Sequence, residues 1–387
     1  MSLVDDARKL GPQLAAAARG DDTLRRLGDD TWKRLLEGGF LRALQPARWG
    51  GGEVSFLEFA DAVLELSAAS PSAGWVAGVI GVHPWQLALF PAQAQRDLWG
   101  EDPTSMHSSS YNPTGKAERV SGGYRVSGRW SFSSGCDHCR GVNLGAIAGT
   151  REIAGATMPD FRSFLLLEGE YRIEDNWHVA GLRGTGSKDI VVEGAFVPEH
   201  RTQSHLDYAL NLPLPGRDRN DGPLYRLPWS VVFNVALAAS TLGSARGFLE
   251  IWTEESRARV VMGKRVADDA LAQLRLAQAT WDLEASVTRM RADIRELEDM
   301  AEAHVAASMQ QRAHLRWNLT RGCELVGRAV TDLFHAASGR TIFLDHPLQR
   351  RFQDVQGALG HAYLVADPVG RALGGYLLGT TTPEPMM

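Results

Sequence analysis

The stretch Ser127-Gly128-Arg129-Trp130-Ser131-Phe132-Ser133-Ser134-Gly135 brings together four serine hydroxyl groups, two aromatic rings and two glycines. A flat ligand with polar edges and apolar faces needs this combination of side chains. A serine-rich strand end whose hydroxyls bond to their own backbone has the same composition, and spacing alone favours that structural explanation. The choice between the two explanations rests on the rest of the chain.

The segment around this stretch is predicted to be β-structure. From Pro103 to about Gln203, glycine and β-branched residues are frequent and short runs alternate between apolar and polar residues. Gly122-Gly123, between two such runs, is typical of a hairpin. The close spacing of the runs favours an antiparallel barrel or sandwich.

Both flanks of this segment are predicted to be helical. Phe56 to Ala69 repeats apolar residues at helical spacing, whereas Ser72 to Phe90 is apolar nearly all round. Trp229 to Glu255 is predicted as a helix, and the span from Gly263 to Gly322 contains no internal glycine or proline. The chain therefore divides into three expected domains, residues 1–103, 104–204 and 205–387.

The last domain is predicted to be a helical bundle. One seam of apolar residues follows steps of three and four, as in a packed bundle helix. Its members are Leu283, Val287, Met290, Ile294, Leu297, Ala301 and Val305. Two further predicted helices, Thr320 to Ala337 and Gln349 to Leu378, close the bundle.

The composition predicts an ordinary soluble globular protein, because the 387 residues carry a net charge of −5 and 44% of them are hydrophobic. There is no basic stripe of the kind that binds nucleic acid. The N-terminus, with Asp5 and Asp6, does not resemble a secretory signal. The most apolar run, Trp229 to Ala239, contains Asn234 and is too short to span a bilayer. We therefore expect a cytoplasmic protein without nucleic-acid or membrane partners.

The three cysteines, Cys136, Cys139 and Cys323, fit a reducing compartment. The first two have the spacing of half a metal or redox site, but no second pair completes it, so we expect no metal. The sequence also lacks the glycine-rich dinucleotide fingerprint, the phosphate loop, the His-Glu-x-x-His motif and the nucleophile elbow.

Four groups of residues spread along the chain carry a resemblance to a known family. They are Gly74-Trp75-Val76 with Gly81-Val82-His83-Pro84-Trp85, Trp130-Ser131-Phe132-Ser133-Ser134-Gly135, Gly181-Leu182-Arg183-Gly184-Thr185-Gly186-Ser187 with Val197-Pro198, and Asp354 with His361. In these runs the chain resembles the acyl-CoA dehydrogenase superfamily, and within it the oxygenases of two-component flavin-dependent monooxygenases. The similarity is strongest to the phenol and secosteroid hydroxylases, such as 4-hydroxyphenylacetate hydroxylase.

The resemblance implies an α+β fold with a helical N-terminal domain, a central antiparallel β-barrel domain and a C-terminal four-helix bundle. It further implies a homotetramer in which reduced flavin, FMN or FAD, lies between the middle domain and the bundle. Helices of a neighbouring subunit would then contact the phosphate end of the flavin. Because the chain has no nicotinamide site of its own, a separate NAD(P)H:flavin reductase is expected to supply the reduced flavin.

One departure from the family decides the expected subclass. In the dehydrogenases a catalytic Glu in the last helices removes the α-proton of the substrate. The matching run here, from Asp354 to Ala362, contains no Glu, and His361 stands one residue before the equivalent place. Fatty acyl-CoA dehydrogenation is therefore the less favoured reaction.

The implied chemistry is the reaction of reduced flavin with O2 to a C4a-hydroperoxide, which must be protected from water. Protection requires a hydrogen-bond acceptor near flavin N5 and a water-poor pocket. A serine hydroxyl can serve as that acceptor. By match to the family, Ser134 lies beside N5, with Ser133 and Trp130 lining the same face.

Hydroxylation of a phenol is faster when the phenol is ionised, and free phenol has a pKa of about 10. A neutral histidine within hydrogen-bond reach is a suitable base. The first choice for this base is His361, and the second is His83. A lone histidine on an apolar helix is more often a satisfied core residue, so His83 depends on its match to the family.

Four further residues complete the predicted site. Trp75 is predicted to pack against the flavin or the substrate ring, although tryptophan is also common in hydrophobic cores. Ser109 is predicted to face the flavin or the substrate oxygen, or else to belong to a polar loop. Arg259 of the adjacent subunit is the first candidate for the flavin phosphate, because a guanidinium binds phosphate with two hydrogen bonds. Arg226 is a weaker candidate.

The sequence thus predicts an oxygenase component that uses reduced flavin and O2 to hydroxylate a small phenolic substrate at the ortho position. One alternative is an enzyme of the same scaffold that oxygenates sulfur or nitrogen, as in a thiophene or an amino sugar. Another alternative is a non-catalytic helical scaffold that has lost its cofactor.

Overall fold

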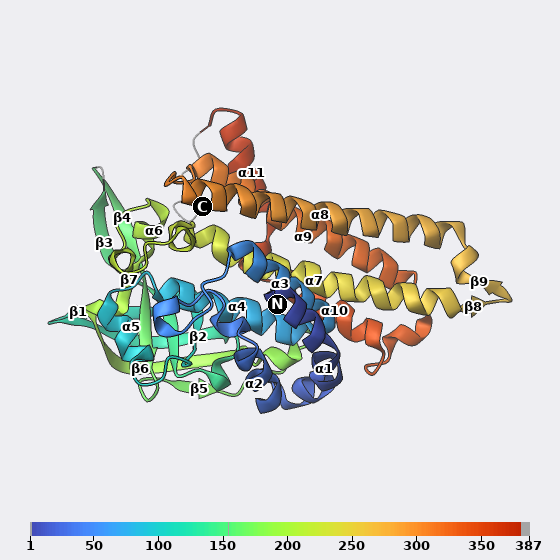
Figure 1. Ribbon diagram of the computed structural model, residues 1–387, viewed down its shortest axis with the longest axis horizontal. Coiled ribbons are helices and arrows are strands. Elements are labelled where there is room, and N and C mark those ends of the chain that lie inside the picture. Colours follow the sequence, from blue (N-terminus) through green and yellow to red (C-terminus); the bar gives the residue numbers. More distant parts are fainter. Residues whose placement is uncertain (1, 154, 381–387) are drawn as a thin grey trace.

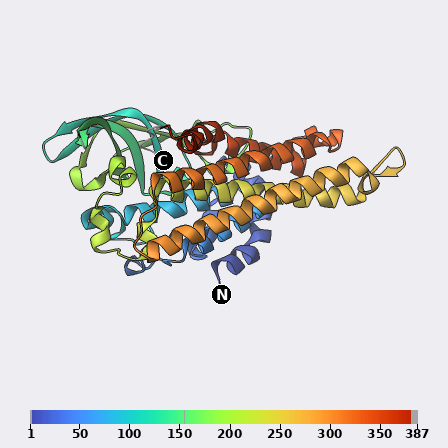
Figure 2. The same ribbon diagram turned by 90° about the horizontal axis from the view of Figure 1, so that it is seen from above.

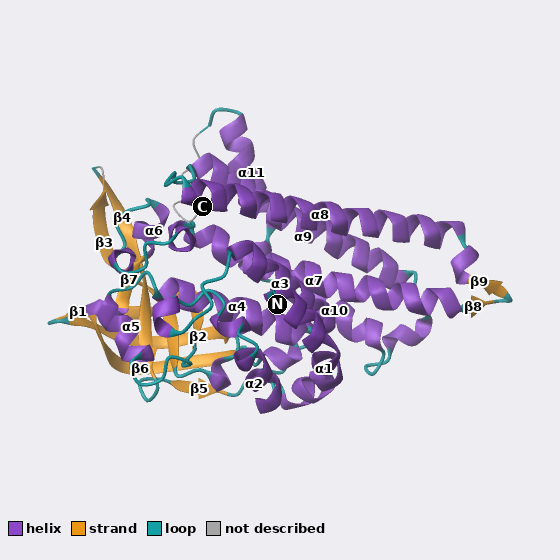
Figure 3. Cartoon of the chain, viewed as in Figure 1, coloured by secondary structure: helices purple, strands orange, loops and turns teal. Residues whose placement is uncertain are grey.

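The computed structural model describes residues 2–153 and 155–380, in which helices come first, then a sheet, then helices again. Figure 1 shows an elongated molecule with the sheet at one end and long helices running away from it. Figure 3 distinguishes helices from strands: the seven strands of the main sheet gather at one end, and the short hairpin of β8 (Val260–Val261) and β9 (Lys264–Arg265) lies at the other.

The N-terminal region is helical, as predicted. Its helices are α1 (Leu3–Leu24), α2 (Asp29–Glu37), α3 (Phe56–Ala69), α4 (Pro71–Leu87) and α5 (Ala92–Trp99). Ser55 caps α3 by accepting the backbone N–H of Glu58, and Pro71 occupies the first turn of α4, where its missing N–H costs nothing. Every residue of α4 except Val79 is buried, which confirms the prediction from its apolar composition.

The central sheet has the strand order β5-β6-β2-β1-β3-β4-β7. The strands are β1 (His107–Val120), β2 (Gly123–Ser133), β3 (Gly141–Ile153), β4 (Ala156–Leu167), β5 (Arg172–Glu174), β6 (Lys188–Pro198) and β7 (Thr202–Ser204). The predicted hairpin is confirmed, because Gly122 turns with a φ of 78° between β1 and β2. The prediction of a purely antiparallel barrel is wrong in one respect: β1 and β3 are parallel. After β2 the chain crosses to the other side of β1 and so enters β3 in the direction of β1.

The C-terminal region is built around long helices that lie side by side in Figures 1 and 2. The helices are α6 (His205–Ala209), α7 (Trp229–Ala258), α8 (Ala270–Glu302), α9 (Met309–His335), α10 (Pro347–Leu359) and α11 (Ala366–Leu377). The predicted seam lies on α8, but this helix ends at Glu302, so Val305 falls in the turn before α9. The predicted helix from Gln349 to Leu378 is two helices, α10 and α11.

Helix α7 is the core of this bundle. Among the described residues it is the one helix long and apolar enough to cross a membrane, and 94% of its most apolar window is buried inside the protein. At 30 residues it is longer than the apolar run from which it was predicted. Its apolar character is therefore explained by packing against the neighbouring helices.

A tight joint connects the sheet domain to the bundle at the loop before η4 (Arg183–Thr185). The backbone N–H of Leu182 donates to Asp354 Oδ1 on α10 at 2.7 Å. A methyl group added to Gly181 would lie 1.9 Å from the backbone oxygen of Gln353, so only glycine permits this approach. Burial raises the pKa of Asp354 to about 6. The joint fixes the η4 loop against the end of the chain that carries His361.

Candidate active site

One face of α4 borders the candidate site. Trp75, Val79, His83 and Gln86 follow one another in steps of four, four and three residues, so they lie on the same side of the helix. Val79 is the only residue of α4 that is partly exposed. Solvent therefore reaches this otherwise buried helix between Trp75 and His83, and the polar groups of the site lie around both of these side chains.

A chain of hydroxyl groups, hereafter the hydroxyl chain, begins at Trp75. The indole Nε1–H of Trp75 donates to Ser134 Oγ at 3.2 Å, and Ser134 Oγ lies 2.7 Å from Ser187 Oγ. Ser187 Oγ lies 2.7 Å from Thr185 Oγ1, which donates to the Leu182 carbonyl at 2.9 Å. The hydroxyl chain thus joins α4, the end of β2 and the η4 loop.

The direction of the hydroxyl chain follows from counting donors. Each hydroxyl has one O–H and two lone pairs. Because Thr185 donates to a carbonyl, Ser187 donates to Thr185, and Ser134 in turn donates to Ser187. One lone pair of Ser134 accepts from Trp75, and the other remains. Ser134 can therefore offer a ligand an acceptor, which is the property predicted for the group beside flavin N5.

The bundle brings His361 to the same place. Its ring centroid lies 5.9 Å from that of Trp75 and 6.1 Å from that of Tyr363. His361 caps the short 3₁₀ turn η10 (Ala362–Leu364), because its Nδ1 accepts the backbone N–H of Tyr363 at 3.1 Å. In the neutral ring this leaves the proton on Nε2, so His361 presents a donor. Desolvation lowers the pKa of His361 to about 4, which keeps the ring neutral at pH 7.

Two predicted neighbours of Ser134 point elsewhere. The ring of Trp130 is fully buried in the core of the sheet domain, where its Nε1–H donates to the Gly145 carbonyl at 2.7 Å. Ser133 is also fully buried and donates to Ser108 Oγ at 2.9 Å. The expectation that both line the same face as Ser134 is therefore wrong. The register of β2 against β6 shifts between Trp130 and Ser133, and such a bulge re-aims the side chains that follow it.

The other end of the α4 face carries two serine–histidine pairs. His83 Nε2 lies 2.8 Å from Ser109 Oγ, and His205 Nε2 lies 2.6 Å from Ser163 Oγ. Tyr111 stands between the pairs, 6.5 Å from His83 and 5.6 Å from His205 between ring centroids. The remaining rings of this histidine cluster are His107, Phe161, Tyr208, Trp229 and Phe233.

The histidine cluster contains many buried polar atoms that form no hydrogen bond of good geometry with a described residue. Buried polar groups in folded proteins nearly always have a hydrogen-bond partner, so such a group marks a place where a ligand or water binds. The unsatisfied atoms are His83 Nδ1, Gln86 Nε2, both ring nitrogens of His107, both side-chain polar atoms of Asn143, His205 Nδ1, Tyr208 Oη and Trp229 Nε1. The interior here is suited to a ligand with several neutral hydrogen-bonding groups.

Burial also sets the charge state of the cluster. Desolvation lowers the pKa of His83 and that of His205 to about 3, and lowers the pKa of His107 well below its ordinary value. All three rings are therefore neutral at pH 7. Each can accept a hydrogen bond from a ligand without first having to lose a proton.

The two predicted arginines lie apart from the hydroxyl chain. Arg259 follows α7 and precedes the β8 strand (Val260–Val261), at the end of the molecule opposite the sheet (Figure 1). Its Nη2 donates to the Ala336 carbonyl at 3.0 Å. Arg226 donates to the backbone carbonyls of Ala301 and Asp221 and lines a small cavity beside Tyr208 and Trp229. Within one chain, neither arginine reaches Ser134.

Phe132 is a feature that the sequence alone did not assign. Its side chain is 69% exposed, its φ is 68°, and its ring meets that of Trp177 edge to face at 6.1 Å. A bulky residue rarely adopts a positive φ, and such strain is commonest at functional positions. Ser187, His107, Ser163 and His205 were also not predicted, because they come from loops and strand ends whose proximity depends on the fold.

Comparison with known families agrees with this architecture. Residues 7–106 match the family described as acyl-CoA dehydrogenase, N-terminal domain, and residues 235–366 match acyl-CoA dehydrogenase, C-terminal domain. The crystal structure of 3-HSA hydroxylase from Rhodococcus sp. RHA1 superposes with a TM-score of 0.93 at 35% identity, covering 100% of this chain and 99% of that one. The predicted order of helical region, β-sheet domain and helical domain is that of the acyl-CoA dehydrogenase fold.

Two relatives narrow the class further. The chain is 37% identical over 354 residues to HsaA from Rhodococcus jostii, the oxygenase subunit of a flavin-dependent monooxygenase, and the match covers 91% of each chain. It is 32% identical over 374 residues to the oxygenase component of an FADH2-dependent resorcinol hydroxylase from Rhizobium sp., covering 94% of this chain and 91% of that one. The chain therefore belongs to the acyl-CoA dehydrogenase-like oxygenase components of two-component flavin-dependent monooxygenases.

The residues around the hydroxyl chain fit a reduced flavin. The isoalloxazine ring is flat, with apolar faces and a donor at N5 in its reduced form. The free lone pair of Ser134 matches this donor, and the exposed ring of Phe132 with that of Trp177 offers an apolar surface nearby. Ser134, Trp75 and His361 are the residues that would hold the reacting edge of the flavin.

The neutral histidines predict a pH dependence of stability. Above pH 6.5 these histidines are neutral in both the folded and the unfolded protein. Below pH 6.5 each histidine binds a proton in the unfolded chain, whereas the buried ring of the folded protein stays neutral. Each buried histidine should therefore lower the free energy of unfolding by about 1.4 kcal/mol per pH unit between its unfolded and folded pKa. His205→Phe should remove about 2 kcal/mol of the loss between pH 6.5 and 4.5, as measured by urea unfolding. The exposed His178→Phe is the control, and a profile for His205→Phe parallel to the wild type would contradict the prediction.

Proposed function

We propose that this protein is the oxygenase component of a two-component monooxygenase that hydroxylates a phenolic substrate ortho to its hydroxyl group. The observation that carries the proposal is the convergence of Trp75, Ser134 and His361 from three regions of the chain, with one acceptor lone pair left on Ser134. When bound, reduced FMN or FAD supplies the reduction of O2 and the transfer of one oxygen atom. A separate NAD(P)H:flavin reductase provides the reduced flavin.

In this proposal Ser134 accepts a hydrogen bond from flavin N5–H and so holds that proton in place. The Trp75 indole fixes the Ser134 oxygen by donating to it, and a bound flavin would cover Val79, the one partly exposed residue of this face of α4. A proton held at N5 in a dry pocket prevents the loss of activated oxygen as H2O2. Ser134 thus couples the consumption of O2 to hydroxylation.

The geometry favours His83 over His361 as the group that draws the proton from the phenol. In the tautomer with the proton on Nδ1, His83 Nε2 accepts the Ser109 O–H at 2.8 Å, and Ser109 can accept in turn from the substrate. His361 has its Nδ1 occupied by the η10 cap and presents an N–H. We therefore reverse the predicted order of the two histidines: His83 acts as base through Ser109, and His361 donates a hydrogen bond.

Two relatives support a phenolic substrate, since one is named a resorcinol hydroxylase and another a p-hydroxyphenylacetate 3-hydroxylase. The neutral polar groups of the histidine cluster support a substrate with neutral oxygen substituents in addition to the reacting hydroxyl. Arg259 would bind the flavin phosphate of a neighbouring subunit in a homotetramer. The apolar residues that follow it, including Met262 with 98% of its side chain exposed, favour such a contact between copies.

The first test of the proposal measures how much of the O2 consumed appears in hydroxylated product. Wild-type protein given chemically reduced flavin, O2 and a panel of phenols should form about one hydroxylated product per O2 consumed with its preferred substrate. Ser134→Ala should consume O2 at a similar rate but release most of it as H2O2, because N5–H loses its acceptor. Ser110→Ala is the control, since its hydroxyl donates to the Ser131 carbonyl outside the hydroxyl chain. Absence of any phenol product from the wild type would refute the proposal.

The contribution of Phe132 to flavin binding can be separated from its contribution to folding. Phe132→Gly removes the exposed ring and relieves the positive φ, so the free energy of unfolding should change by less than about 1 kcal/mol. The affinity for reduced flavin should fall at least tenfold, as measured anaerobically by fluorescence titration. Phe196→Ala removes another exposed phenylalanine of the same sheet and should leave the affinity unchanged. Equal affinity in Phe132→Gly and wild type would show that this ring does not contact the flavin.

The roles of the two histidines differ in how their loss can be compensated. His83→Ala should lower the hydroxylation rate about 100-fold, the usual effect of losing a general base. A more acidic phenol, or a pH near 10, should restore much of the rate, because the substrate then ionises without help. His361→Ala should slow hydroxylation without rescue by either change. If His83→Ala hydroxylates at the wild-type rate at neutral pH, oxygenation of sulfur or nitrogen becomes the better explanation.

A further inference from the structure

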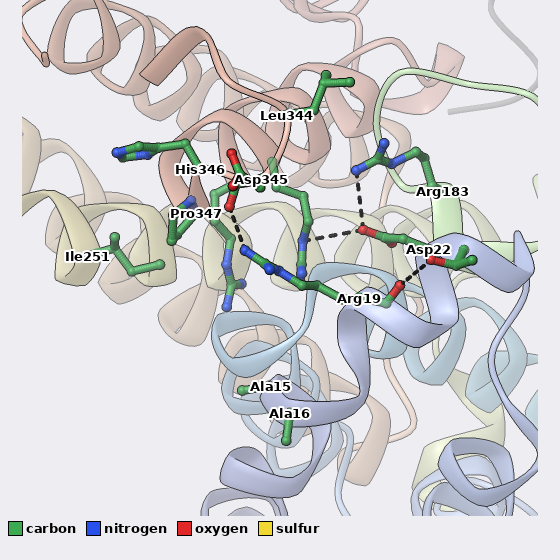
Figure 4. Close-up of a pocket in the computed structure, with 13 residues that line it drawn as sticks. Ala15, Ala16, Arg19, Asp22, Arg183, Ile251, Leu344, Asp345, His346 and Pro347 are labelled. Atoms are coloured by element: carbon green, nitrogen blue, oxygen red, sulfur yellow. Dashed lines mark hydrogen bonds and ion pairs between the residues drawn. The ribbon is translucent and has the colours of Figure 1, made fainter. Parts of the chain in front are cut away.

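A cavity of about 520 Å³ lies outside the site described above, between α1, η4, α7 and the start of α10 (Figure 4). Its volume falls within the range of small-molecule sites, about 300–1,000 Å³. Four arginines and two aspartates line it, so its formal charge is 4 − 2 = +2. The apolar part of the wall comes from short or branched side chains, including Ala15 and Ile251.

The charges in the cavity are only partly balanced. Asp22 is the shared acid, with Arg183 Nη2 at 3.5 Å and Arg350 Nε at 3.4 Å, and Figure 4 shows Arg183 pointing toward it. Arg19 binds the Asp345 backbone carbonyl, which carries no full charge. Arg351 binds the backbone carbonyls of Ser67 and Ala69. Asp22 therefore forms ion pairs with the guanidinium groups of Arg183 and Arg350, whereas Arg19 and Arg351 bind neutral carbonyl oxygens.

Arg350 is the residue with the most unused capacity. Only 16% of its side chain is exposed, and its contacts to Asp22 and Asp354 are both made through Nε. In the part of the chain that the structure describes, no group accepts a hydrogen bond from its Nη1 or Nη2, and neither atom is fully buried. These donors therefore reach the open space of the cavity and are available to a ligand.

The position of Arg350 near the N-terminus of α10 also favours the binding of an anion. Helix α10 begins at Pro347 beside the cavity, its first turn contains no acidic residue, and Arg350 and Arg351 follow directly. The N-terminus of a helix carries a partial positive charge, so adjacent arginines there are unfavourable unless an anion is near. The positive end of α10 and the guanidinium groups converge on the same space.

We propose that this cavity binds a phosphate group, either free or carried by a small molecule of up to nucleotide size, at a site separate from the flavin. Arg350 and Arg183 bind the phosphate oxygens, and Arg19 closes the outer side. The cavity lies next to the candidate active site, because η4 and α10 both border it. These two elements are held together by the 2.7 Å hydrogen bond between Leu182, which precedes η4, and Asp354 on α10. A bound anion would therefore also hold the η4 loop, which carries the end of the hydroxyl chain.

The proposal is tested by calorimetric titration of the full chain, without flavin, with inorganic phosphate, pyrophosphate and AMP in a low-salt buffer. At least one probe should bind saturably with a dissociation constant below about 1 mM, in the range of weak specific binding. Arg350→Gln and Arg183→Gln should each weaken this binding at least tenfold. Arg8→Gln is the matched control on α1, since Arg8 pairs with Glu65 and lies outside the cavity. Tight binding of inorganic phosphate alone would identify a free-ion site, whereas preference for AMP would identify an organic phosphate, and both support the proposal.

Any of several results would overturn the proposal. One is the absence of saturable binding to the wild type at about 10 mM probe, 10-fold above the expected dissociation constant. Others are wild-type affinity in folded Arg350→Gln and Arg183→Gln, and equal weakening by Arg8→Gln. Because Arg350 contacts Asp354, its substitution also perturbs the joint. Arg19→Gln, at an exposed position, therefore provides a second variant and should weaken binding at least threefold. The probe that binds should also raise the melting temperature of the wild type and not that of Arg183→Gln. A thermal shift that persists in Arg183→Gln would likewise place the anion elsewhere.

Discussion

The hydrogen bond between the Leu182 N–H and Asp354 is the interaction on which the candidate site depends. It joins two segments that are 172 residues apart in the chain and holds the η4 loop against α10. The carbonyl of the same residue, Leu182, then accepts from Thr185 and fixes the direction of the whole hydroxyl chain. A carboxylate on the bundle thereby determines that Ser134 offers an acceptor. The close approach at Gly181, which has no side chain to obstruct it, makes this bond possible.

Desolvation is the second constraint, and it divides the molecule into regions of different charge. In the histidine cluster the rings are neutral, because burial without an acidic partner disfavours the charged form. On the other side of α10 the cavity near Arg350 concentrates positive charge around a single shared acid, Asp22. The first region suits an uncharged aromatic compound and the second suits an anion. The two regions are close because both depend on the η4 loop and α10.

Local sequence patterns predicted much of the fold. The limits of α3, the burial of α4 and the hairpin at Gly122-Gly123 each depend on neighbours in the chain, through capping, composition and turn geometry. The parallel pairing of β1 with β3 was not predictable in this way, because it depends on where the chain crosses the sheet. The break between α10 and α11 also escaped prediction, since it is made by the His361 side chain capping η10.

The sequence by itself determined which residue types are available for chemistry: the serines at the end of β2, His83 on α4, His361 after α10, and the absence of a Glu between Asp354 and Ala362. The tertiary structure alone decided how they are used. A bulge in β2 directs Trp130 and Ser133 into the protein interior. The Nδ1 of His361 accepts a backbone N–H at the start of η10, and His83 forms a hydrogen bond with Ser109. The physical reason is that side-chain direction and hydrogen-bond partners are set by contacts between segments distant in the chain, and no local pattern of residues records them.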